Sequence, residues 1–429
     1  MRIYGLLILF AFAAFSNAAD SDLTSKASAP KSDASAEEFF AAGMRYYLNG
    51  DYSSAREMFA NSKNDKNDMG AISRMYLASI AAYNGEKSAA ELFKAALANP
   101  PKNEDARFAL AEQYGRFALA NGDYKGAAEF LKPYSQTKNS DKLASLVDWY
   151  RAWALWELGK KDESKALLAD VLPHYFRYPN AIGADAFVEA YAENDELAKS
   201  VEISKLPTDT PAAAARMAFL EGRDFSQIPQ KDISLFCLIV LAEKGVKVDP
   251  KILYEKSYEG RDAPFAWRGY LALSEIVFKE GRYAEAENAA LQALKLVPSD
   301  FQSANPIHMA LADALRLQKK YDDARYHYEK IFMNRKTRGE SSAESLYKTG
   351  LCWYEQGDWA KAHAYFERVF VAYFNFEYWG SRAYYYDARA LYSLGLRRDA
   401  NATLVEYFRR AKDRKSEIFI QAKQFYDNI

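Results

Sequence analysis

The sequence predicts an all-α fold in which antiparallel helix pairs stack into a solenoid. The first observation is a turn that recurs at even spacing: intervals of 38 residues separate Gly281, Lys319, Gly357 and Gly395, and intervals of 37 separate Gly85, Gly122 and Gly159. The second is that a small residue precedes each turn, and Ala and then a large apolar residue follow it. Because one helix pair leaves an apolar face uncovered, such units need stacked neighbours for stability.

Residues 1–18 have the three parts of a secretory signal peptide. A cation at Arg2 precedes an apolar run from Gly5 to Phe15, and small residues lead up to Ala18. The run is shorter than the roughly 20 residues that a membrane-spanning helix needs. We therefore expect cleavage after Ala18, with a retained anchor as the alternative. No cysteine follows the run, so a lipoprotein-type acyl attachment is not expected.

Residues 19–36 carry one large apolar side chain, Leu23, among Ser, Ala, Lys and Asp. Such a segment cannot bury enough surface to offset the entropy of ordering, so we expect a disordered leader. Folding should begin near Glu37.

The charge balance gives no support to a nucleic-acid or anionic-membrane partner. The chain has 57 Lys and Arg against 58 Asp and Glu, a net charge of −1, whereas such partners favour a basic excess. Only two cysteines occur, Cys237 and Cys352, both in apolar surroundings. We expect them to be buried as small hydrophobic residues, and a disulfide between them is the alternative.

The repeated pattern is clearest at the two ends of the array. One copy contains Phe39, Gly43, Tyr46, Gly50, Tyr52, Ala55 and Phe59, and another contains Gly350, Trp353, Gly357, Trp359, Ala362 and Phe366. This pattern resembles the tetratricopeptide repeat (TPR). The resemblance implies a right-handed TPR superhelical solenoid of antiparallel helix pairs, with TPR arrays at 37–172 and 263–411.

The spacing is longer than the ~34 residues of the standard repeat. In this it is similar to the TPR arrays of bacterial envelope proteins, such as the Tol–Pal-associated periplasmic coordinator and the outer-membrane assembly lipoprotein BamD. This resemblance implies a protein of the periplasm or one associated with the outer membrane.

Two segments depart from the repeat. Residues 173–262 are expected to form degenerate helical repeats that continue the array and could bend it, with a separate linker domain as the alternative. In residues 412–429 an apolar face at Ile418, Ala422, Phe425 and Ile429 predicts a capping helix.

Aromatic residues are concentrated between 371 and 388, in VAYFNFEYWGSRAYYYDA. Counting from the small residue Ala388, we expect Tyr384 and Leu391 to face the core. Whether the cluster at 373–386 is exposed is left open by the pattern.

The resemblance also implies a concave groove lined by the first helix of each pair. The groove positions carried over from the family are Arg382, Tyr385, Arg389 and Tyr392 in the last repeat, Glu344, Tyr347, Leu351 and Tyr354 before it, and Met309, Asp313 and Arg316 before that. Tyr and Arg are enriched at binding hot spots. We therefore predict binding of a protein or peptide partner there; the alternative is that the arginines stay solvated or pair with Glu344 and Asp387.

No residues are predicted to be catalytic, to bind a cofactor or to ligate a metal. The four histidines, His174, His308, His327 and His363, are scattered in the sequence, and neither a zinc-binding nor a phosphate-binding motif occurs. The sequence does not predict an enzyme.

The functional prediction is an exported scaffold or adaptor of the bacterial cell envelope, neither a nucleic-acid-binding nor an integral membrane protein. The alternative is glycan binding by exposed rings. Tyr378 and Trp379 lie at a predicted turn, and an exposed Trp379 beside a flat neighbouring ring would favour the glycan.

Overall fold

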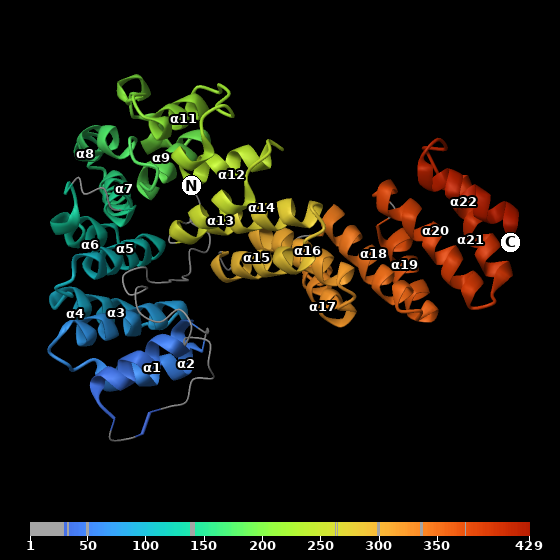
Figure 1. The fold of residues 1–429 in the computed structure, drawn as a ribbon, viewed down its shortest axis with the longest axis horizontal. Helices are drawn as coiled ribbons and strands as arrows, with labels where there is room; N and C mark the ends of the chain where they lie inside the picture. Colours follow the sequence, from blue (N-terminus) through green and yellow to red (C-terminus); the bar gives the residue numbers. More distant parts are fainter. Residues whose placement is uncertain are drawn as a thin grey trace. The chain divides into compact units, whose positions relative to one another are not determined.

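The computed structural model describes residues 30–31, 34–48, 51–137, 142–261, 263, 265–297, 301–334, 338–373 and 375–429, without the side chains of 48, 142 and 301–303. The predicted signal peptide and most of the predicted leader lie outside these ranges. Every regular element in the described part is a helix, shown in Figure 1. The all-α fold of stacked helix pairs is therefore confirmed.

The chain divides into two compact units, Met1–Gly269 (unit 1) and Tyr270–Ile429 (unit 2). The helices of unit 1 are α1 (Ala36–Leu48), α2 (Tyr52–Ser62), α3 (Asp68–Tyr83), α4 (Ala89–Ala98), α5 (Glu104–Ala120), α6 (Tyr124–Phe130), α7 (Lys142–Glu157), α8 (Lys161–Tyr175), α9 (Ile182–Ala192), α10 (Glu196–Lys199), α11 (Pro211–Leu220), α12 (Leu235–Glu243) and α13 (Pro250–Glu259). Short 3-10 helices lie at Lys132–Tyr134, Ile203–Lys205 and Gln230–Asp232.

The unit boundary falls inside α14 (Ala266–Lys279). The remaining helices of unit 2 are α15 (Tyr283–Leu296), α16 (Phe301–Leu317), α17 (Tyr321–Phe332), α18 (Glu340–Glu355), α19 (Trp359–Ala372), α20 (Glu377–Ser393), α21 (Arg397–Arg410) and α22 (Glu417–Asn428). Consecutive helices from α15 to α21 pack against each other, and α20 also packs against α18 and α22.

The predicted turns have the backbone conformation that their sequence requires. Each turn residue has a positive φ, between 63° and 82°, at Gly85, Gly122, Gly159, Gly281, Lys319, Gly357 and Gly395. Glycine adopts this left-handed conformation without steric cost, which is why it ends the first helix of a pair. The same conformation occurs at Asn194, Gly222 and Gly245. The region 173–262 thus uses the turn of the repeats, with shorter helices between.

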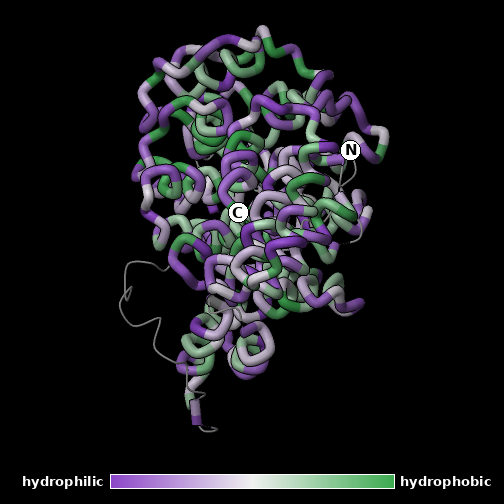
Figure 2. Tube along the Cα trace, turned by 90° about the vertical axis from the view of Figure 1, so that its right-hand side faces the viewer, coloured by the Kyte–Doolittle hydropathy of each residue, from purple (hydrophilic) through white to green (hydrophobic). Residues whose placement is uncertain are grey.

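The core of unit 2 is built from residues on both helices of each pair. Phe366 and Ala362 of α19 are fully buried against Leu346 of α18 and Ala383 of α20. At the C-terminal end α22 buries Ala422 and packs Phe425 and Ile429 against the neighbouring core, in agreement with the predicted apolar face. Green and purple segments alternate along the helices in Figure 2, as expected where each helix has one buried face.

Candidate partner-binding surface

Helix α20 brings the four predicted groove residues of the last repeat onto one face. Arg382, Tyr385, Arg389 and Tyr392, here called the α20 stripe, are all half-buried. Spacings of three, four and three residues place them along one side of the helix. Tyr384 and Leu391, predicted to face the core, are buried at 5% and 4% exposure. The division of α20 into a core face and a half-exposed face is therefore confirmed.

Aromatic rings hold both arginines of the stripe. The guanidinium carbon of Arg382 lies 3.5 Å from the ring centroid of Tyr378. That of Arg389 lies 5.5 to 5.8 Å from the ring centroids of Tyr385, Tyr354 and Tyr386. Cation–π contacts of this kind fix the position of the guanidinium and leave its N–H groups able to donate.

Neither arginine forms an ion pair with a carboxylate of the described residues. The alternative prediction, in which Glu344 or Asp387 neutralises them, is wrong. The Glu344 carboxylate lies 2.6 Å from the Lys348 amino group, and Asp387 accepts from His363. The other half of that alternative, in which both arginines stay solvated, stays a prediction.

The last helix supports the tyrosines of the stripe. The Phe425 ring of α22 packs edge-on against Tyr385 and Tyr392, with centroid distances of 6.2 and 5.6 Å. Both tyrosines nevertheless remain half-exposed. Because one edge of each ring is fixed, little side-chain entropy remains to be lost when a partner binds.

On α16 and α18 the charged side chains at the predicted groove positions already have ion-pair partners within the chain. Lys348 Nζ lies 2.7 Å from Asp313 Oδ2, and Arg316 Nη1 lies 2.5 Å from Glu355 Oε1. Arg316 is thus held in an ion pair between α16 and α18, and Glu344 in one with Lys348 within α18. They differ in this respect from the arginines of α20.

The other two predicted tyrosines have different environments. Tyr354 is half-buried, with the ring of Tyr386 5.3 Å from its own. Tyr347 is 5% exposed, and its ring lies 5.7 Å from the rings of Phe366 and Trp379. The prediction that Tyr347 lines an exposed groove is wrong, because its side chain fills the core between α18, α19 and α20.

The aromatic cluster at 373–386 is divided between core and surface. Trp379 packs against the core of unit 2 with its indole N–H buried, whereas Tyr378 is 54% exposed. The two rings meet edge-on, at 84°, so they do not form one flat platform. The glycan alternative stays a prediction and depends on Tyr378.

Three of the four histidines have close partners that their sequence positions did not predict. The Nδ1 atoms of His308 and His327 lie 3.0 Å apart. Burial lowers the pKa of both, and His308 and burial together lower that of His327 to about 4. His363 Nδ1 lies 2.6 Å from the buried Asp387, a hydrogen bond that raises the pKa of His363. Within the described ranges, His, Cys, Asp and Glu form no cluster of three suited to a metal.

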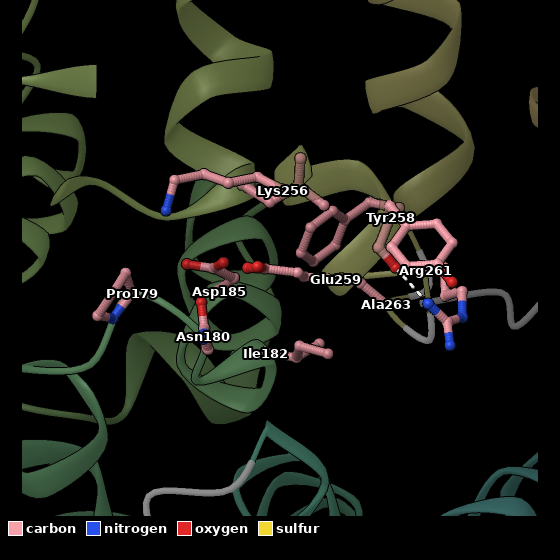
Figure 3. Close-up of a pocket in the computed structure, with 12 residues that line it drawn as sticks. Pro179, Asn180, Ile182, Asp185, Lys256, Tyr258, Glu259, Arg261 and Ala263 are labelled. Atoms are coloured by element: carbon pink, nitrogen blue, oxygen red, sulfur yellow. Dashed lines mark hydrogen bonds between the residues drawn. The ribbon is translucent and has the colours of Figure 1, made fainter. Parts of the chain in front are cut away.

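A cavity of about 330 Å³ opens in unit 1 beside the end of α13 (Figure 3). Lys256, Glu259 and Arg261 line one side, opposite Asn180 and Asp185. Burial lowers the pKa of Lys256. The wall offers side chains of both charges, and no motif in the sequence predicted this cavity.

Asp185 is anchored behind the cavity by the fully buried Arg216. Arg216 Nε donates to Asp185 Oδ1 at 2.7 Å, and Nη1 donates to the carbonyls of Phe176 and Tyr178 at 2.9 Å. The pair ties α11 to α9 and to the loop before α9. One sequence signal could have found it: Arg216 is the only charged residue of α11, PAAAARMAFL, and a lone charge in an apolar helix indicates a buried partner.

Both cysteines, Cys237 and Cys352, are buried and unpaired, as the sequence predicted. Burial raises the pKa of each thiol to about 12, so neither is a reactive thiolate at neutral pH.

Comparison with known proteins supports the repeat assignment. The tetratricopeptide repeat profile matches residues 254–306 and 279–335. A comparison with curated proteins found no match. Two similar solved structures are the APC/C hetero-tetramer Cut9–Hcn1 and yeast Tom70, each 14% identical. The match to Cut9–Hcn1 covers 92% of this chain and 91% of the matched chain, with a TM-score of 0.29. The match to Tom70 covers 92% of this chain and 95% of the matched chain, with a TM-score of 0.27. Similarity at these scores does not establish a common fold.

The matched repeats suggest a scaffold for protein interaction, with proteins as partners. No helix in the described ranges has both the length and the apolar character needed to cross a membrane.

Proposed function

We propose that the protein is an exported scaffold or adaptor that binds a protein or peptide segment along the α20 stripe, in the bacterial periplasm or at the outer membrane. One observation carries the proposal. Arg382 and Arg389 are half-buried, rest on tyrosine rings, and form no ion pair with the carboxylates that the structure describes. A carboxylate from a partner would accept charge-assisted hydrogen bonds from these guanidinium groups and pair with their charge.

The stripe also indicates how a partner would lie on it. Arg382 and Arg389 are seven residues apart on α20, which corresponds to about 10 Å along the axis at 1.5 Å per residue. An extended segment covers that distance in about three residues. Tyr385 between the arginines and Tyr392 beyond them supply large apolar area at low entropic cost. We therefore expect a segment with two carboxylates about three residues apart and an apolar side chain between them.

Export is supported by the N-terminal pattern of residues 1–18. It is tested by expressing the full chain in a Gram-negative bacterium and fractionating the cells. We expect the protein in the periplasmic or outer-membrane fraction, with a mature N-terminus at Ala19. Recovery in the cytoplasm with an intact N-terminus would refute export and leave the binding proposal untouched.

Binding is tested by cross-linking the mature protein in an envelope extract and identifying the proteins that are retained. The test variant is Arg382→Glu with Arg389→Glu. The control variant, Lys279→Glu with Arg398→Glu, makes the same charge change at two exposed positions that form no ion pair in the described residues. We expect one specific protein to be retained by the native form and the control, and lost from the test variant although its circular dichroism is unchanged.

Retention of the same proteins by the test variant would refute the stripe as the binding surface. Retention of envelope oligosaccharide without any protein, abolished by Tyr378→Ala, would replace the proposal by the glycan alternative.

A further inference from the structure

Unit 2 has a second candidate surface where α17 and α19 end. A pocket of about 650 Å³ lies between these helix ends and the residues that lead into α18 and α20. This is within the ~300–1,000 Å³ range of ligand pockets. None of the residues that line it belongs to the α20 stripe. The surface is therefore separate from the one assigned to the proposed function.

The floor of the pocket is apolar. It is formed by Phe332, Leu346, Val371, Tyr373 and Phe376. Val371 is 66% exposed, although it belongs to the helix that contributes Phe366 to the core. Met333, next to Phe332 in sequence, is 69% exposed. Of the floor residues, Val371 is exposed, Phe332, Tyr373 and Phe376 are half-buried, and Leu346 is buried. Exposed apolar patches mark interaction surfaces in soluble proteins.

The charge at the edge of the pocket is positive. Arg338 and Arg368 line it together with one carboxylate, that of Glu367. Both arginines are exposed, and neither lies within ion-pair distance of a carboxylate among the residues that the structure describes. The guanidinium carbon of Arg368 lies 5.8 Å from the Phe332 ring centroid and 5.3 Å from that of Tyr365. It is thus held beside the apolar floor.

We propose that this α17/α19 pocket binds an acidic peptide segment in which Asp or Glu residues flank one large apolar side chain. The apolar side chain would fill the space above Val371 and Phe376. The flanking carboxylates would accept hydrogen bonds from Arg338 and Arg368, which favour bidentate pairing with carboxylates. A basic segment is disfavoured because it would meet two positive charges against one negative charge.

The test starts from phage-displayed random octapeptides selected on the immobilised stripe variant Arg382→Glu with Arg389→Glu, because the α20 stripe is itself proposed to bind segments that carry carboxylates. Selected peptides are then synthesised with a fluorescent label, and their dissociation constants are measured by fluorescence polarisation. We expect peptides that carry Asp or Glu within three residues of Phe, Leu or Met. Their affinity should fall at least tenfold in Arg338→Glu with Arg368→Glu, and at least tenfold in Val371→Asp, while circular dichroism stays unchanged.

Two controls locate the effect. The charge control Lys279→Glu with Arg398→Glu and the stripe variant Arg382→Glu with Arg389→Glu should each bind the selected peptides within twofold of the native protein. Val371→Asp adds a charge at an exposed position, so its loss of binding would not come from core disruption. Selection of no peptide, selection without acidic residues, or unchanged affinity in both pocket variants would overturn the proposal.

Discussion

Gly350 of α18 lies directly against the ring of Phe366 of α19. A methyl group built on Gly350 would come within 2.7 Å of the ring carbons of Phe366, which is fully buried. The same relationship recurs in the first helix pair, where a methyl group built on Gly43 would lie 2.8 Å from ring carbons of Phe59. In these two helix pairs a glycine on the first helix lets the second helix bring an aromatic ring up to the backbone of the first.

Gly350→Ala should destabilise unit 2. Alanine normally stabilises a helix interior by about 1 kcal/mol relative to glycine, but displacing a packed ring costs about 1–3 kcal/mol. We expect a net loss of up to about 2 kcal/mol in the free energy of unfolding, measured by urea denaturation. Gly380→Ala on α20 is the matched control, because no atom lies within 4 Å of the added methyl. It should be neutral or stabilising, and equal effects of the two substitutions would contradict the packing relationship.

Arg216→Met should be strongly destabilising. It would leave the Asp185 carboxylate buried without its cation, and breaking a buried ion pair costs about 3–5 kcal/mol. The double variant Arg216→Met with Asp185→Leu should recover part of this loss, since no charge then remains buried. Lys205→Met, which removes an exposed ion pair to Glu202 at 2.6 Å, should cost no more than about 0.5 kcal/mol. A comparably small cost for Arg216→Met, by urea denaturation, would show that the buried pair contributes little.

The His308–His327 contact should make the fold sensitive to acid. His327 has a pKa of about 4 in the folded chain against an ordinary 6.5, so the unfolded chain takes up its proton first. Stability is therefore full above pH 6.5 and is lost as the pH falls toward 4. Because solvent screens the interaction, we expect the free energy of unfolding to fall by on the order of 1 kcal/mol over this pH range. His327→Gln should flatten this dependence in urea denaturation between pH 7.5 and 4.5, and an unchanged slope would contradict it.

His363 should act in the opposite direction. Its hydrogen bond to Asp387 raises its pKa above 6.5, so its stabilising contribution is present below pH 6.5 and is lost as the pH rises through the raised pKa. The native protein should exceed His363→Gln in stability at pH 6, and the gap should narrow at higher pH. Proton NMR titration gives a direct check: the ring signal of His363 should titrate above pH 6.5 and that of His327 below it.

The periodic features of this protein could be predicted from its sequence because they are local. A glycine with a positive φ, such as Gly357, and a core position spaced along one helix, such as Tyr384, depend on residues only a few positions away. For the same reason the two faces of α20 were predicted correctly, as were Ala422, Phe425 and Ile429 of the apolar face of α22; the structure packs Phe419 against the core in place of the predicted Ile418.

Only the tertiary structure decided which charged and aromatic side chains meet. Arg216 with Asp185, His308 with His327, and His363 with Asp387 are separated by 31, 19 and 24 positions. Their contacts depend on how each helix is rotated about its axis relative to its neighbour. A repeat pattern indicates which residues face the core but does not determine that rotation closely enough to predict which side chains meet. That same rotation buries Tyr347, leaves Arg382 and Arg389 without an ion-pair partner among the described residues, and opens the α17/α19 pocket. The sequence by itself determined the repeat and its turns, and packing between helices determined the surfaces that the repeat offers to a partner.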